Sequence, residues 1–306
     1  MGYLLITGKC FADFAEGEKS FKAKDYSTAL REFQPLAISG NAAAQIYLGL
    51  MYEQGLGLTV DHKVAVDWYR KAADQGLAAA QYKVGEAYDY SRGETQNLQQ
   101  AMAWYLKAAD QDFSSAHLMI ASMFYEGHGV PKDYKQAMSW YQKGAEIGHR
   151  VAQYRLAAMY DTGLGVTKDH TQAVIWYQKA AKQKHAYAQF SLGYLYTTGQ
   201  GVTKDYKQAM YWYRIAAEQG LEDAQFNLAA GFENGLGVPH DPIIAYAIYS
   251  LQKINSDAAY HLKTVERKLS QGDIVLAQNL AGELKQSGQF IKALDTYLCK
   301  KNKAGC

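Results

Sequence analysis

The stretch that decides the fold occupies residues 151–183 and reads VAQYRLAAMYDTGLGVTKDHTQAVIWYQKAAKQ. The same residue types return when the window is shifted by 36 residues in either direction. All five tryptophans keep this spacing: Trp68, Trp104, Trp140, Trp176 and Trp212. A fixed period of this length with helical spacing inside it is typical of a stacked solenoid. We therefore expect function to reside on the surface of an array rather than in one motif.

The chain divides into four segments by the quality of the repeat. Six full repeats fill residues 41–256, and a looser helix pair at 13–40 is interpreted as an atypical leading repeat. Residues 257–306 lose the register, and their apolar spacing predicts a helical cap followed by a basic tail. Residues 1–12 are a candidate remnant of a signal peptide. We predict one elongated all-α domain.

Each repeat predicts two helices, A and B, joined by a regular loop. In the first repeat, Ala44, Leu48 and Tyr52 are spaced by four residues and therefore share one face of helix A. Trp68 and Tyr69 belong to the matching stripe of helix B. Small alanines alternate with large aromatics, which allows helices to approach closely. We expect the tryptophans, which all occupy one packing row, to be buried.

The loop has its own signals for where helices end and begin. Gly55 stands where helix A ends in the left-handed conformation, and Asp61 supplies an N-cap acceptor for helix B. A glutamine three residues after the cap predicts a capping box. Four repeats have one: Gln100, Gln136, Gln172 and Gln208. In the C-terminal segment, Asp273 is the expected cap of a further helix.

Charge and hydropathy exclude several classes of function. The net charge is only +2, and acidic and basic residues alternate through the repeats, so we expect no nucleic-acid partner. The one basic cluster is Lys300, Lys301 and Lys303. No apolar run reaches the ~20 residues that a membrane-spanning helix needs. We therefore expect no membrane span.

The pattern A-x-x-x-L-G-x-x-Y-x-x-G-x-G-V-x-x-D-x-x-x-A-x-x-W-Y-x-K-A-A-x-Q-G over residues 41–256 resembles the SEL-one-like repeat (SLR) family, which is related to the tetratricopeptide repeat. The resemblance implies a right-handed α/α superhelix, a solenoid of 36-residue helix-turn-helix repeats, that acts as a protein-interaction scaffold or adaptor. It also implies that helix A lines the concave groove. Bacterial members of the family are often exported. Its cysteine-rich exported branch carries a disulfide in each repeat, and this chain lacks those cysteines.

The compartment is argued from the start of the chain. Residues 3–6 are apolar and resemble the tail of a signal segment, but Lys9 interrupts a core that needs ~7–15 residues. Two alternatives remain: a periplasmic or secreted protein, or a cytoplasmic one. The cysteines, Cys10, Cys299 and Cys306, lie outside the repeats. If residues 1–12 are removed, Cys299 and Cys306 remain and could pair in an oxidising space.

Three patterns suggest chemistry, and each has a simpler interpretation. The Gly-x-Gly at 163–165 precedes a helix, but no strand comes before it, so a structural turn is expected instead of a phosphate site. The histidines form no known metal-binding motif. Ser250 and Lys253 make one S-x-x-K, unaccompanied by the other motifs of a β-lactam-binding serine enzyme. We predict no enzyme, cofactor or metal site; the alternative is an enzyme acting on cell-wall peptide or β-lactam.

The remaining candidate site is the stripe of helix A whose residues differ from copy to copy. Aromatic residues and single charges on such a stripe are typical of a surface that binds a protein or peptide. The candidate partner-binding residues are Tyr47, Lys83, Tyr90, Met119, Glu126, Tyr154, Arg155, Tyr187, Tyr194 and Asn227. Tyr187 and Tyr194 are two turns apart on one helix face, so they are the expected anchors. The unusual second-repeat loop at 89–94 is either a contact or neutral variation.

Overall fold

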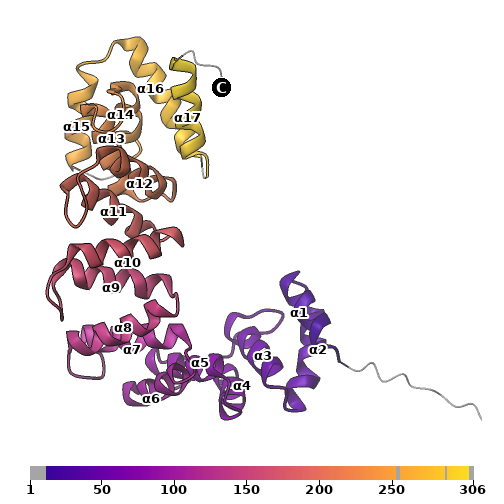
Figure 1. Cartoon of the computed structure of the whole chain (residues 1–306). Helices are drawn as coiled ribbons and strands as arrows, with labels where there is room; N and C mark the ends of the chain where they lie inside the picture. The colour runs from indigo at the N-terminus through magenta and orange to yellow at the C-terminus, as the bar shows by residue number, and fades with distance from the viewer. Residues whose placement is uncertain (1–11, 253–255, 287, 303–306) are drawn as a thin grey trace, which may run out of the picture. The chain divides into compact units, whose positions relative to one another are not determined.

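The structure is a computed structural model that describes residues 12–252, 256–286 and 288–302. Over these ranges it contains seventeen helices and no strand, which confirms the predicted all-α class (Figure 1). The chain divides into two compact units, the first ending at Ile147 and the second beginning at Gly148. No helix in the described ranges has the length and apolar character needed to cross a membrane.

The first unit contains the leading helix pair and three repeats. Its helices are α1 (Phe14–Lys22), α2 (Tyr26–Ile38), α3 (Ala42–Gln54), α4 (His62–Asp74), α5 (Ala78–Asp89), α6 (Leu98–Ala109), α7 (Ser114–Glu126) and α8 (Tyr134–Glu146). Helices α3 and α4, α5 and α6, and α7 and α8 pack together as the predicted A and B helices. Each repeat packs on the next through α4 with α5 and α6 with α7, and α2 packs on α3 in the same way.

The second unit contains three further repeats and a C-terminal group of helices. Its helices are α9 (Arg150–Thr162), α10 (His170–Lys182), α11 (Ala186–Thr198), α12 (Tyr206–Glu218), α13 (Glu222–Asn234), α14 (Pro242–Tyr249), α15 (Ser256–Glu266), α16 (Gln271–Leu284) and α17 (Phe290–Asn302). Helices α15 and α16 pack on α14, and α17 packs on α16 and α12. These contacts place α15 and α16 against the last repeat and α17 against the fifth.

Helix B begins at an Asp or Asn side chain, as predicted, but the capping box is wrong. Asp133 accepts hydrogen bonds from the Lys135 and Gln136 backbone N–H groups at 2.9 and 3.0 Å. Its own N–H donates to the Phe124 carbonyl at 2.9 Å, so this N–H is already used and the Gln136 side chain is not its partner. The same backbone bond joins the cap to helix A in every repeat. It closes the loop between the two helices.

Glycines shape this loop by conformation and by close approach. Gly55 ends α3 with φ 69°, and in the second repeat Ser91 adopts φ 58° at the same place. The next glycine of that loop, Gly93, packs directly against the His62 carbonyl, where a Cβ would collide with the backbone. The matching glycines Gly57, Gly129, Gly201 and Gly237 also lie close to the start of the preceding helix B, so these loops are fitted against that helix.

The core of each interface is a buried tyrosine of helix B lying against a small residue of helix A. Tyr105 is fully buried, and a Cβ added at Gly85 would lie 2.6 Å from its ring. Gly49 and Gly193 approach Tyr69 and Tyr213 in the same way. This close approach lets the helices bury the aromatic ring, and burying such a ring contributes about 2–3 kcal/mol per interface.

The tryptophans are only partly buried, which contradicts the expectation from their packing row. The tyrosine that follows each one occupies the core instead. A lysine three residues further on covers four of the five indole rings: Lys71, Lys107, Lys143 and Lys179 lie 3.6 to 4.1 Å from the ring centroids. The rings thus lie between core and solvent and bind a cation on their outer face.

A ladder of glutamine side chains links neighbouring helices inside each unit. Gln45 donates to the Ala37 carbonyl at 3.1 Å and accepts from Gln75 Nε2 at 2.8 Å. Further pairs join Gln81 with Gln111, Gln153 with Gln183 and Gln189 with Gln219. The third repeat has His117 and Ile147 at these two positions. The ladder satisfies buried amides, which would otherwise lose hydrogen bonds to water.

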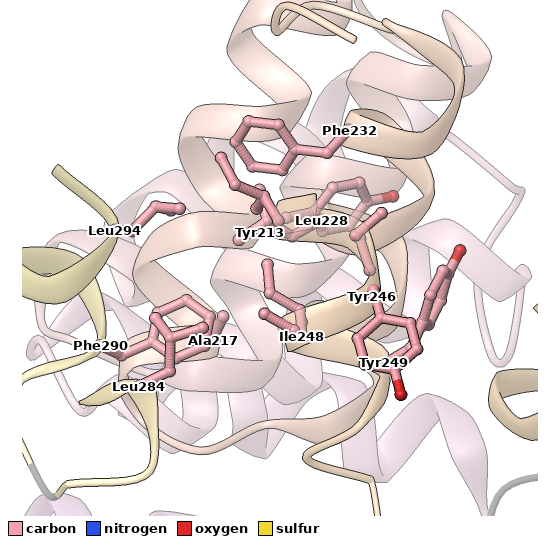
Figure 2. Packing of buried hydrophobic residues seen from close by; sticks show 14 of the residues in the cluster. Tyr213, Ala217, Leu228, Phe232, Tyr246, Ile248, Tyr249, Leu284, Phe290 and Leu294 are labelled. Atoms are coloured by element: carbon pink, nitrogen blue, oxygen red, sulfur yellow. The ribbon is translucent and has the colours of Figure 1, made fainter. Parts of the chain in front are cut away.

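The C-terminal helices complete the core of the second unit (Figure 2). Leu284 of α16 and Phe290 and Leu294 of α17 join one apolar cluster with Tyr213 and Tyr249 of the repeats. Helix α16 is capped by Ser270; the expected cap, Asp273, instead forms the third residue of a capping box with it. The reason is that the helix begins at Gln271, one turn earlier than expected.

Cys299 lies in α17 and is disulfide-bonded. Its proposed partner Cys306, like Cys10, lies outside the described residues. The predicted pairing of Cys299 with Cys306 therefore stays a prediction.

Candidate functional site

The ten predicted residues lie on a stripe of helix A and its C-terminal end, which we call the variable face. Three of its tyrosines are clearly at the surface: Tyr90 is 49%, Tyr187 54% and Tyr194 48% exposed. Glu126 and Arg155 are exposed as well. The other five are partly buried: Tyr47, Lys83, Met119, Tyr154 and Asn227.

Tyr47 is held by the packing of the first unit. Its ring stacks on Phe33 with centroids 4.5 Å apart, and its hydroxyl donates to Glu18 Oε1 at 2.7 Å. Burial, together with this bond to a carboxylate, raises the pKa of Tyr47 to about 12. Because both its ring and its hydroxyl are engaged, Tyr47 joins α1 to α3 rather than presenting a free aromatic surface.

Lys83 is part of an ion-pair network that also fixes the unusual second-repeat loop. Its ammonium lies 2.9 Å from Glu86 and 3.4 Å from Glu53, and these pairs raise the pKa of Lys83 against the opposing effect of burial. Arg92 reaches Glu53 at 3.8 Å, and Glu94 binds Arg70 at 2.6 Å. The loop at 89–94 is thus tied to the first repeat by charge.

Three predicted residues meet at a hollow in the first unit. Tyr90, Met119 and Glu126 line a cavity of about 210 Å³ together with four further residues: Asp89, Ser122, Met123 and His128. Asp89 is 3% exposed; it accepts from the Tyr105 hydroxyl at 3.1 Å and lies 3.0 Å from His128 Nε2. The hollow combines an aromatic ring, thioethers and carboxylates, which suits a side chain from a partner protein.

A second group of predicted residues meets in the second unit. Tyr154 stacks on His185 with ring centroids 4.5 Å apart, and Tyr187 lies 6.2 Å from Tyr154 and 6.4 Å from His185. We call these three residues the aromatic cluster. Burial, reinforced by Arg150 and Arg155, lowers the pKa of His185 to about 4, so its ring is neutral at pH 7. In this neutral state, His185 Nδ1 accepts the Ala188 N–H at 3.3 Å and caps α11.

Pairs of a histidine with a carboxylate tie helices together within and between repeats, and these pairs were not predicted from the sequence. A helix A residue accepts the hydroxyl of the buried tyrosine sixteen positions later, as Glu53 does from Tyr69 at 2.7 Å. Three such carboxylates also contact a histidine: Asp89 with His128, Asp161 with His170, and Glu233 with His261. The recurring acidic position was a usable signal, but the histidines occupy different positions in each repeat and gave none.

The residues considered for catalysis have structural roles. Ser250 donates its hydroxyl to the Ala247 carbonyl at 2.7 Å at the end of α14, and Lys253 lies outside the described residues. Gly163 of the Gly-x-Gly stretch ends α9 with φ 80°. Over residues 12–252, 256–286 and 288–302, no group of three or more His, Cys, Asp or Glu side chains is placed to hold a metal ion.

Comparison with known proteins agrees with this architecture. Six Sel1 repeats match the chain at residues 42–77, 78–113, 114–149, 150–185, 186–221 and 222–251. The crystal structure of a Sel1 repeat protein from Oxalobacter formigenes is 33% identical, with a TM-score of 0.70, over 84% of this chain and 99% of that one. The protein c5321, a protective antigen present in uropathogenic Escherichia coli strains, displays an SLR fold; it is 29% identical, with a TM-score of 0.54, over 95% of this chain and 71% of that one.

None of the curated proteins compared with the chain is significantly similar to it. The repeat matches are continuous from 42 to 251 and follow the 36-residue period of the tryptophans, and the structure pairs its helices in the same order. The chain belongs to the Sel1 repeat family.

Proposed function

We propose that this protein is a non-catalytic scaffold or adaptor whose variable face, as the lining of the helix A groove, binds a protein or peptide partner. Sel1 repeat proteins are generally scaffolds for protein interactions. Within each unit, neighbouring repeats pack together, and such packed helix pairs present side chains of successive A helices to a partner. The described residues of the candidate catalytic patterns are used for helix ends and turns.

The observation that carries the proposal is the exposure of Tyr90, Tyr187 and Tyr194. Tyrosines of the packing rows, such as Tyr105 and Tyr213, are almost completely buried in the same repeats. Leaving a large aromatic ring in water forgoes the stabilisation that burial would give. Rigid tyrosines at a surface are frequent anchors of protein interfaces.

The proposal includes export to the periplasm or the medium, with the cytoplasm as the alternative. The similar protein from uropathogenic E. coli strains is described as a protective antigen, which supports this part of the proposal. We expect immunoblots of fractionated bacterial cells to find this protein outside the cytoplasm. Recovery only in the cytoplasmic fraction would remove export from the proposal and leave the scaffold function intact.

Variants of one helix test the binding face. We expect Tyr187→Ala with Tyr194→Ala to weaken partner binding by about 30-fold or more, because losing one interface anchor typically costs ~2 kcal/mol. Both rings are half exposed, so the melting temperature should stay within a few degrees. Proteins captured by the wild-type chain would first be identified by mass spectrometry, and their affinities then measured for each variant.

Tyr196→Ala is the matched control, because Tyr196 lies on the same helix but packs against the apolar core. It should lower the melting temperature and leave binding nearly unchanged below that temperature. If the double variant binds like the wild type, the proposed face is wrong, and the hollow at Tyr90 becomes the next surface to test.

A further inference from the structure

Two arginines beside the aromatic cluster have no carboxylate partner. Arg150 is the first residue of α9, and Arg155 lies five residues further along the same helix. Both are exposed, and neither forms an ion pair with any residue that the structure describes. After burial, the positive charges of both arginines lower the pKa of His185, one of the three rings, so both lie close enough to influence it. The arginines and the three rings therefore belong to one local surface.

Several acidic side chains of the second unit are engaged away from the two arginines. Asp161 pairs with His170, and Glu233 pairs with His261. Three further carboxylates contact α17 or belong to it: Asp241 binds Lys301, Asp295 binds Arg214, and Glu218 accepts the Ile291 N–H. Asp169 and Asp205 cap their helices. Among the described residues, no carboxylate lies within ion-pair distance of Arg150 or Arg155, so the surface around the aromatic cluster carries two unpaired positive charges.

We propose that Arg150, Arg155 and the aromatic cluster of Tyr154, His185 and Tyr187 form a docking surface for an acidic peptide segment of a partner protein. This inference rests on the proposed scaffold function and names its partner chemistry. A guanidinium donates paired hydrogen bonds that match a carboxylate. The stacked rings supply rigid apolar area for the residues between the acidic side chains.

Charge complementarity favours a peptide over a nucleic acid. A nucleic-acid surface needs many cations in a row to contact successive phosphates. Here two guanidiniums stand one and a half turns apart on a single helix, next to rings that are already stacked on each other. Two separate carboxylates on a short peptide match this arrangement.

Sibling repeats supply variants that are expected to fold. The position of Arg150 holds alanine in three other repeats: Ala42, Ala78 and Ala186. The position of Arg155 holds Ser191 in the next repeat. Arg150→Ala with Arg155→Ser therefore introduces residues that the same helix position already accepts. The double change Lys168→Gln with Lys182→Gln is the control, because it removes the same charge from exposed sites outside helix A.

The experiment measures fluorescence anisotropy of fluorescein-labelled decapeptides with the full chain. The probes are five Glu-Tyr repeats, five Gln-Tyr repeats, and a ten-nucleotide single-stranded DNA. We expect the Glu-Tyr peptide to bind most tightly, and its affinity to fall about tenfold in Arg150→Ala with Arg155→Ser but less than twofold in the lysine control. Raising the salt concentration should weaken the binding of the wild type.

Four results would overturn the inference. These are no saturable binding of the Glu-Tyr peptide, equal binding of the Gln-Tyr peptide, tighter binding of the DNA, or unchanged affinity in the arginine variant. The captured partner separates this inference from the proposed function. If the tyrosine double variant loses the partner and the arginine variant keeps it, the acidic-peptide inference is wrong and the scaffold function stands. If both variants keep the partner, the binding face itself is wrong.

Discussion

Lys83 and Arg155 occupy the same position of helix A, two repeats apart, yet the structure uses the two cations differently. Lys83 is bound by Glu86 at 2.9 Å and Glu53 at 3.4 Å, whereas Arg155 has no ion-pair partner among the described residues. The residue three positions further along the helix differs: it is Glu86 in one repeat and Ala158 in the other. A cation on the variable face is therefore available to a partner only where its helix neighbour leaves it unpaired.

Disrupting the ion pairs of Lys83 should produce the largest effect on stability. We expect Glu53→Ala to lower the free energy of unfolding by about 2–3 kcal/mol, because the change leaves Tyr69 and Lys83 without their shared acceptor in a partly buried place. Arg155→Ser should change it by less than about 0.5 kcal/mol. Urea denaturation of both variants measures the difference.

Glu53→Gln is the matched control for the network, since it keeps an acceptor for Tyr69 but loses the charge. Its free energy of unfolding should lie between those of the wild type and Glu53→Ala. If Glu53→Ala costs no more than Arg155→Ser, the network does not anchor the second-repeat loop.

Near the unpaired Arg155, His185 should make the stability of the fold depend on pH. The pKa of His185 is about 4 in the folded chain and about 6.5 when the chain is unfolded. The unfolded chain therefore binds more protons between these values, and the stability contributed by neutral His185 is present above pH 6.5 and lost as pH falls to 4. After allowing for solvent screening, we expect a loss on the order of 1–2 kcal/mol.

His185→Asn should remove this part of the pH dependence and retain the cap, since Asn41 caps α3 at the same position. Urea midpoints at pH 7 and pH 4 should differ less in this variant than in the wild type. An equal difference in both proteins would mean that other groups account for the whole acid sensitivity.

Giving Arg155 an ion-pair partner on its own helix should produce the smallest change in stability. Ala158→Glu places a carboxylate three residues after Arg155, as Glu86 follows Lys83. We expect a gain in stability of about 0.2–0.5 kcal/mol, and binding of the Glu-Tyr peptide weaker by about threefold, because Arg155 would now have an internal partner. Ala158→Gln provides the control of similar size without charge. Unchanged peptide binding in Ala158→Glu would show that Arg155 does not contact the peptide.

The repeated features of the fold could be predicted from the sequence because each recurs in most of the six repeats. The 36-residue period, the helix A and B boundaries, the left-handed glycine at Gly55 and the cap at Asp61 all follow from residue types that recur at fixed positions. The tryptophan prediction was wrong because recurrence shows that a position matters and does not show how deep it lies. The lysine three residues after four of the five indoles was the missing signal.

From the sequence, the candidate binding site could be predicted only as a stripe along helix A. Exposure of Tyr187 and Tyr194 follows from their place between packing rows, but the pairing of Asp89 with His128 joins residues 39 positions apart in neighbouring repeats. No other repeat has both an acidic residue and a histidine at these two positions, so comparing the repeats does not reveal the pair. The stacking of His185 on Tyr154 likewise joins two residues from neighbouring repeats. Contacts between two variable positions require coordinates.

The glutamine ladder bears on how a chain of near copies finds its register during folding. Because the packing rows are so similar, a helix B that docks one repeat out of place still buries nearly the same apolar surface. In the first unit, however, Ile147 and His117 stand where Gln75 and Gln45 form their amide pair. A slip that brings Ile147 against a buried glutamine leaves the oxygen of that amide without its donor, at about 1–3 kcal/mol. The departure from the repeat thereby marks one place in the chain and discriminates against misregistered folding.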